Sequence, residues 1–138
     1  AHKKKVIFSN GCFDLIHLGH IEVLARASDL GNILIVAVNS DKSIKKIKGN
    51  KRPILKEESR LQQIAALEFV DAVLLFDEDN PYETIKSLLP NVIVKGGDYC
   101  SEDVIGNNLV KQIGGEVVIV PLTKGYSTTT IFEKIKNE

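Results

Sequence analysis

Short apolar runs alternate with segments of helical periodicity along this chain. The apolar runs are nearly continuous and rich in β-branched residues, which is typical of parallel strands that are covered on both faces. They predict five strands, over residues 5–8, 32–38, 72–76, 92–95 and 116–120. We expect the second of these strands to lie near the centre of the sheet.

The segments between the apolar runs predict five helices, over residues 19–30, 57–67, 81–88, 103–113 and 127–136. Gly31, Pro81, Pro90 and the Gly114-Gly115 pair mark their ends. A strand that alternates with a helix over the whole length favours an α/β fold: a Rossmann-like, doubly wound, five-stranded parallel sheet in three α/β/α layers. The length fits one domain, residues 1–138.

One stretch, residues 42–55, has no clear periodicity. It is basic, and it carries Gly49 and Pro53. We expect an irregular loop with room for one helical turn at its start. Long irregular loops are often functional, although a group of lysines on a loop is most often only a solvated surface.

Polar residues gather just after the predicted strands. They occupy residues 9–14, 39–41, 95–99 and 124–129. Ligands of open parallel sheets bind beyond the carboxyl ends of the strands, at the point where the strand order reverses. We therefore expect these segments to lie along one edge of the sheet and to line one site.

His17 and His20 are the most informative residues of the first segment. They stand three residues apart at the predicted start of a helix, so both face the same side. The free amides and the positive dipole end of the helix favour an anion there. A polyphosphate is the expected guest, although a histidine pair at this spacing also occurs by chance. No cysteine or third histidine stands at metal-ligand spacing, so we expect no metal held by the protein itself.

Composition narrows the class of ligand. Lys plus Arg equals Asp plus Glu at 18 each, so no overall field attracts nucleic acid or a membrane surface. The two cysteines favour reduced thiols over a disulfide framework, and no signal peptide or long apolar run is present. These features predict a soluble, cytoplasmic protein with a small-molecule ligand.

Several candidate site residues also have plain structural explanations. Gly96 and Gly97 fit a tight turn, and Ser127 fits a helix cap. Cys12 fits a small space-filling role beside the site, and Asp14 fits a helix cap or a group that orients His17. The fingerprints GxGxxG and GxxxxGK[ST] are absent, which disfavours a nicotinamide oxidoreductase and a P-loop kinase.

Three motifs occur in order: Gly11-Cys12-Phe13-Asp14, then His17-Leu18-Gly19-His20, and Ser127-Thr128-Thr129 near the carboxyl end. Together they resemble the signature of the cytidylyltransferase-like nucleotidyltransferase superfamily, and the similarity runs over nearly the whole chain. Within that superfamily the chain is most similar to the adenylyltransferases that make ADP-heptose from D-glycero-D-manno-heptose 1-phosphate. Residues 37–41 and 95–99 carry that likeness, as do Lys48-Gly49 and Arg52-Pro53.

Glycerol-3-phosphate cytidylyltransferases are the nearest alternative. They typically have threonine at the place of Cys12 and arginines at the places of Glu68 and Leu122. These departures weaken the case for a cytidylyltransferase. They also leave the phosphates with fewer arginines, so Lys48 or Lys124 would act in their place.

The resemblance implies transfer of AMP from ATP to a sugar 1-phosphate, with release of pyrophosphate, in the synthesis of lipopolysaccharide or another glycan precursor. His17, His20 and Lys48 would be the catalytic residues, and Lys46 would bind the substrate phosphate. The nucleotide would lie against Gly11, Cys12, Phe13, Gly19, Lys95, Gly97, Asp98, Ser127, Thr128 and Thr129. Mg²⁺ would be bound mainly through the nucleotide phosphates.

The resemblance also implies a homodimer, and fusion to or association with a ribokinase-like sugar kinase. Two other functions remain open from the residues alone. One is transfer to another small phosphate, such as phosphopantetheine or phosphocholine. The other belongs to a different class, a nucleotide-binding module without catalysis.

Overall fold

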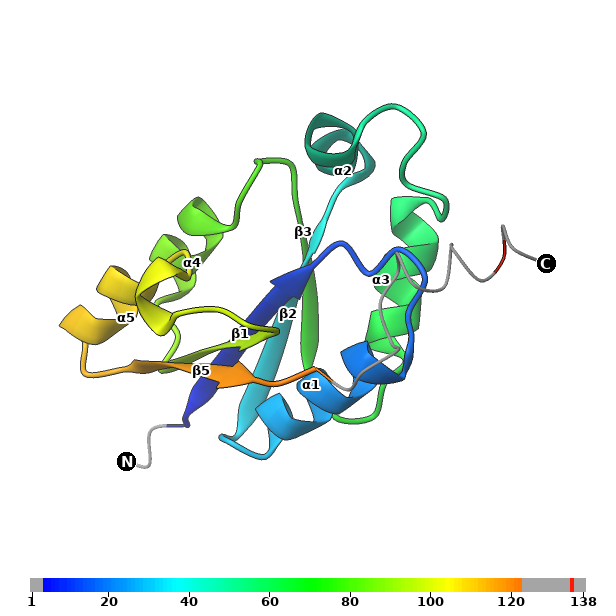
Figure 1. Ribbon diagram of the computed structural model, residues 1–138. Helices are drawn as coiled ribbons and strands as arrows, with labels where there is room; N and C mark the ends of the chain where they lie inside the picture. The colour runs from blue at the N-terminus through cyan, green and yellow to red at the C-terminus, as the bar shows by residue number, and fades with distance from the viewer. Residues whose placement is uncertain (1–3, 123–134, 136–138) are drawn as a thin grey trace.

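The computed structural model describes residues 4–122 and residue 135, and Figure 1 shows their arrangement. Five strands alternate with helices, as the apolar pattern predicts. In chain order the elements are β1 (Val6–Gly11), α1 (Leu18–Ser28), β2 (Ile33–Asn39), α2 (Asp41–Lys48), α3 (Glu57–Ala65), β3 (Ala72–Phe76), α4 (Tyr82–Leu88), β4 (Val92–Gly96), the 3-10 turn η1 (Ser101–Asp103), α5 (Asn107–Gln112) and β5 (Glu116–Val120).

The strands form one parallel sheet in the order β3-β2-β1-β4-β5. The predicted five-stranded, doubly wound parallel sheet is therefore confirmed, and β2 lies inside it. The chain winds outward from β1 through β2 to β3, then crosses to β4 on the other side of β1. The strand order thus reverses between β1 and β4, and a ligand is expected beyond their carboxyl ends.

Helices cover both faces of the sheet and complete three layers (Figure 1). On one face, Val23 and Leu24 of α1 and Ile64 of α3 pack with Ile7 and Leu34 of the sheet. The other face has a core of its own, formed by Phe8, Ala37, Phe76, Ile85, Ile93, Val104 and Val110. Each strand therefore buries side chains on both sides, which explains its nearly continuous apolar sequence.

The structure corrects the expectation of an irregular stretch over residues 42–55. Residues 41–48 form the helix α2, whose first turn is capped by the Ser40 hydroxyl, which accepts a hydrogen bond from the amide of Ser43 (3.1 Å). Asp41 lies in the first turn of this helix. Only Ser43 and Ile44 of this helix are buried. Ile44 and Ile47, three residues apart, give this segment a helical pattern that its many lysines obscure.

Two further boundaries differ from the sequence prediction by three residues or more. β1 continues to Gly11, because Ser9 and Asn10 pair with Val36 and Ala37 of β2 despite being polar. The fifth helix of the described region begins at Asn107 instead of residue 103, because Gly106 stands before it in the left-handed conformation (φ 89°). The predicted helix over residues 127–136 lies outside the described residues. Across residues 4–122, none of the helices has the length and apolar character needed to cross a bilayer.

Candidate active site

A cleft of about 530 Å³ opens beyond the carboxyl ends of β1 and β4, at the reversal of strand order. It brings together most of the described residues that the sequence singles out. The predicted site residues that line it are Gly11, Cys12, Phe13, His17, His20, Lys48 and Lys95. Gly19, Lys46, Gly97 and Asp98 are not among the lining residues, and Lys46 is exposed. Ser127, Thr128, Thr129 and Lys124 lie outside the described residues, so their position relative to the cleft stays a prediction.

The two histidines stack against each other at the start of α1. Their ring centroids are 3.8 Å apart with the ring planes 25° from parallel, and Phe13 meets His20 edge-on at 5.3 Å. The backbone amide of His17 donates to Nδ1 of His20 (3.3 Å). Nδ1 of His20 is therefore the unprotonated nitrogen, and the ring proton is on Nε2. His20 can donate a hydrogen bond to a ligand while it remains neutral.

His17 contributes a buried polar atom that is not satisfied by the protein. Its side chain is buried, and among the described residues Nδ1 has no hydrogen-bond partner. Buried polar atoms without partners are rare in native proteins and often mark functional sites. His17 also lines the cleft, and its side chain faces the backbone of His20 in a capping-box arrangement. Nε2 is therefore the ring nitrogen left for a ligand.

The surroundings of both imidazoles favour their neutral forms. Burial lowers the pKa of His17. Burial, followed by the neighbouring His17 and then Lys48, lowers the pKa of His20 to about 4. The positive potential in the cleft therefore comes from the lysines and from the dipole of α1, while the histidines supply hydrogen bonds. An anion that enters the cleft would offset the smaller part of this shift, which comes from His17 and Lys48.

Lys95 places a second cation in the cleft. It stands near the end of β4, with Nζ 5.6 Å from the centre of the Tyr99 ring. Burial lowers the pKa of Lys95, and the neighbouring Cys12 opposes that shift. Within residues 4–122 no carboxylate forms an ion pair with Lys95. A partly buried ammonium without a carboxylate partner is well suited to a phosphate.

The turn that carries Cys12 and Phe13 is held in a strained shape. Phe13 (φ 52°) and Leu15 (φ 70°) both adopt left-handed backbone conformations, which cost roughly 1 kcal/mol or more each for such side chains. Asp14 fixes this turn from one side, because its carboxylate accepts hydrogen bonds from the backbone amides of Ile54 (2.8 Å) and Leu55 (2.9 Å). Asp14 thus braces the segment after α2 and does not cap α1, where His17 is the N-terminal cap residue.

Arg60 fixes the same turn from the other side. Its guanidinium is fully buried and donates to the carbonyls of Cys12 (2.7 Å), Asn39 (2.6 Å) and Leu55 (2.9 Å). It also forms an ion pair with Asp41 (2.8 Å). One side chain therefore joins the ends of β1 and β2 to α2 and to the segment before α3.

Sequence reasoning missed Arg60 and the part of the cleft that follows β3. Arg60 had a weak signal: it shares the buried face of α3 with Ile64, four residues on, where a charged residue is unusual. Asp79, Asn80 and Pro81 also line the cleft. They follow a strand just as the other site segments do, so the same rule would have found them.

The described residues fit a Mg²⁺ ion carried by phosphates better than one held by a protein cage. No group of three histidine, cysteine, aspartate or glutamate side chains within the described ranges is arranged to hold a metal. The carboxylate of Asp14 is engaged by two backbone amides, which leaves Asp79 as the other carboxylate at the cleft. Mg²⁺ commonly binds with one or two carboxylates plus substrate phosphates.

These features describe a cleft suited to an anion, at the switch point of a Rossmann-like sheet and beside an HxGH helix start. The chain belongs to the Cytidylyltransferase-like family, which it matches over residues 8–134. It is therefore a nucleotidyltransferase, and the family expected from its three motifs is confirmed.

Close relatives extend the match over nearly the whole chain. The bifunctional protein HldE of Citrifermentans bemidjiense is 48% identical over 132 residues, which is 96% of this chain. That of Geobacter metallireducens is 47% identical over 135 residues, or 98% of the chain. The chain spans only 27% and 28% of the length of these two relatives.

Solved structures agree with the fold. The lipopolysaccharide core biosynthesis protein of Thermoplasma volcanium superposes with a TM-score of 0.70 at 32% identity, covering 91% of this chain and all of that protein. The pantoate-beta-alanine ligase of Francisella tularensis superposes with a TM-score of 0.66 at 15% identity over 95% of this chain and 65% of its own. At that identity the second match shows the fold alone.

Proposed function

We propose that this nucleotidyltransferase transfers AMP from ATP to a heptose 1-phosphate, giving ADP-heptose and pyrophosphate. The observation that carries the proposal is the cleft itself, where a neutral, stacked histidine pair lies beside Lys48 and Lys95. The relatives named HldE and the lipopolysaccharide core biosynthesis protein support heptose as the acceptor. Adenine and heptose rest on that kinship, whereas phosphate binding rests on the cleft.

The proposed reaction is an in-line displacement without a covalent enzyme intermediate. A phosphate oxygen of the sugar 1-phosphate attacks the α-phosphorus of ATP, the new O–P bond forms, and the bond to the β-phosphate oxygen breaks. The electron pair leaves with pyrophosphate. The attacking phosphate is largely a dianion at pH 7, so no general base is required. Catalysis then consists of holding two anions in line and stabilising charge on the α-phosphate.

The residues of the cleft fit these tasks. Nε2 of His20 would donate to an oxygen of the α-phosphate, and His17 would do the same from beside it. Lys48 and Lys95 would offset the repulsion between the two phosphates. Mg²⁺ would neutralise the triphosphate. Ser127, Thr128 and Thr129 would hold the β- and γ-phosphates, Gly97 and Asp98 would lie near the nucleoside, and Lys46 would approach the sugar phosphate from α2.

The partner in this proposal is a sugar kinase. The relatives are bifunctional, and the chain matches about a quarter of each, so the remaining length holds the other part. We propose that the other part supplies a phosphorylated heptose, and that this chain is fused to it or associates with it. A homodimer is part of the same proposal.

The test measures pyrophosphate release with ATP, Mg²⁺ and heptose 1-phosphate, and with CTP and glycerol 3-phosphate as the rival pair. We expect His17→Asn and His20→Asn to lower kcat by about a hundredfold or more, as losing one transition-state donor does. Arg26→Ala, an exposed change in the same helix, is the matched control. Full turnover in both histidine variants, or ATP binding without pyrophosphate release for any acceptor, would refute the proposal.

A further inference from the structure

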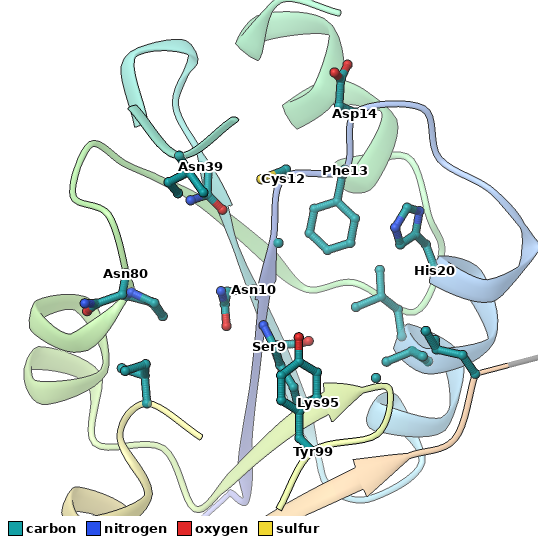
Figure 2. A pocket seen from close by; sticks show the side chains of 18 of the residues that line it. Ser9, Asn10, Cys12, Phe13, Asp14, His20, Asn39, Asn80, Lys95 and Tyr99 are labelled. Atoms are coloured by element: carbon teal, nitrogen blue, oxygen red, sulfur yellow. The ribbon is translucent and has the colours of Figure 1, made fainter. Parts of the chain in front are cut away.

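Asn39 presents a hydrogen-bond acceptor to the cleft that the proposed phosphate chemistry does not use. It is the last residue of β2, its side chain lines the cleft, and it is only 4% exposed. In Figure 2 its amide oxygen points into the cleft, on the side away from His20. Among the described residues nothing donates a hydrogen bond to this oxygen.

The orientation of that amide is determined by its neighbours. The Ser43 hydroxyl donates its single proton to the carbonyl of Glu78 (2.7 Å). Its oxygen can therefore only accept from Asn39, so the amide must turn Nδ2 towards Ser43 (3.0 Å). Oδ1 is left facing the cleft. The backbone carbonyl of Asn39 is fixed as well, by Arg60 (2.6 Å).

A fixed acceptor selects a ligand that donates. Phosphate oxygens at neutral pH are acceptors, so Oδ1 of Asn39 disfavours a phosphate at its position. A hydroxyl group is the fitting partner. Asn10 of β1 lines the same part of the cleft, and its side-chain amide has no hydrogen-bond partner within residues 4–122. Figure 2 shows it between Asn39 and Lys95. An amide can both donate to and accept from neighbouring hydroxyls.

The opposite side of the cleft has a different character. Beyond β4 it is lined by Tyr99, Gly96, Val23 and Leu122. A Cβ on Gly96 would lie 2.7 Å from Val23 Cγ2 and 3.1 Å from Leu122 Cδ2, so these apolar groups pack directly on the bare backbone. An apolar, partly aromatic surface suits a nucleobase, whereas paired amides suit a polyol.

We propose that Asn39 and Asn10 form the subsite for the hydroxyl-bearing body of the acceptor, on the β2 side of the cleft. This inference rests on the proposed function and deepens it. It places the nucleoside on the β4 side, and the reacting phosphates meet between the two, near His20. Asn39 Oδ1 accepts one sugar hydroxyl, and Ser43 is the positioning residue that keeps the amide from turning over.

The experiment compares Asn39→Ala with wild type in steady-state kinetics. We expect the KM for the sugar 1-phosphate to rise about tenfold, the loss that one well-placed hydrogen bond gives. The KM for ATP should change less than twofold. With methyl phosphate, an acceptor without hydroxyl groups, the two proteins should perform alike. Ser43→Ala should raise the KM for the sugar 1-phosphate by a smaller factor, and Asn108→Ala, an exposed asparagine of α5, should change nothing.

Distinct outcomes separate the two proposals. A rise in the KM for ATP would place Asn39 against the ribose and overturn the subsite. Equal losses with methyl phosphate and with the sugar would show a merely structural role, which also overturns it. If no acceptor is turned over by wild type, the transfer proposal fails. The subsite is then judged by calorimetric binding of the sugar 1-phosphate, which Asn39→Ala must weaken if the inference is correct.

Discussion

Replacing Arg60 by leucine removes a side chain that joins several elements around the cleft. The guanidinium is fully buried and makes four hydrogen bonds, of which one is an ion pair with Asp41. Leucine fills part of the volume but leaves three carbonyls and a carboxylate without their donor. Breaking a buried pair from one side typically costs about 3–5 kcal/mol.

The expected loss lies at the lower end of that range. The Asp41 side chain is 28% exposed, so water can hydrate its carboxylate once Arg60 is gone. We therefore expect a loss of about 3 kcal/mol in the free energy of unfolding, because the three carbonyls of Cys12, Asn39 and Leu55 remain poorly hydrated. For a chain of 138 residues this corresponds to a fall of roughly 10 °C in Tm.

The assay is urea denaturation followed by circular dichroism, at pH 7 and constant salt. Arg26→Leu, which removes an exposed arginine from α1, serves as the control and should cost less than about 0.5 kcal/mol. A double-mutant cycle with Asp41→Asn isolates the ion pair from the three carbonyl bonds. A loss below about 1 kcal/mol for Arg60→Leu, with an unchanged denaturant slope, would refute the reasoning.

Two further predictions follow from the geometry of the site. Because the pKa of His20 is lowered from 6.5 to about 4, the unfolded chain binds a proton more readily in that interval. His20 therefore contributes stability to the folded state that is fully present above pH 6.5 and is lost as the pH falls towards 4. After allowing for partial exposure of the ring, we expect the free energy of unfolding to fall by roughly 2 kcal/mol over that interval. His20→Asn should flatten the stability profile over that interval, and a profile identical to wild type would contradict the shift. Gly96→Ala places a Cβ 2.7 Å from Val23 Cγ2, so we expect a loss of about 1–3 kcal/mol from overpacking. The same change in a Val23→Ala background should cost less, and equal costs in both backgrounds would show that this contact is not the cause.

Much of the fold could be predicted because each strand has a distinctive apolar pattern in its own sequence. The runs at Ala72–Phe76 and Glu116–Val120 have the observed bounds. Burial on both faces removes polar residues from such strands, so the pattern survives without knowledge of the partners. The prediction missed the last residues of β1. Ser9 and Asn10 continue this strand to the cleft, where polar side chains replace the apolar pattern of a buried strand.

The candidate site divides in the same way. The HxGH segment and the turn before it lie within ten residues of each other, so their proximity follows from the chain itself. Lys95 depends on β4 lying next to β1, a contact across more than eighty residues that the rule of strand reversal anticipates. No comparable rule predicts that α2 lies near the cleft and brings Lys48 to it.

The sequence by itself determined the alternation of strands and helices, the family signature and the histidine pair at a helix start, because all of these depend on neighbours along the chain. Only the tertiary structure decided the burial of Arg60, the neutral tautomer of His20 and the direction of the Asn39 amide. Each of those depends on hydrogen-bond donors and acceptors contributed by other segments or by the exact turn of the backbone. Composition and periodicity indicate which side chains are buried, but they do not indicate which hydrogen-bond partner a buried polar group has.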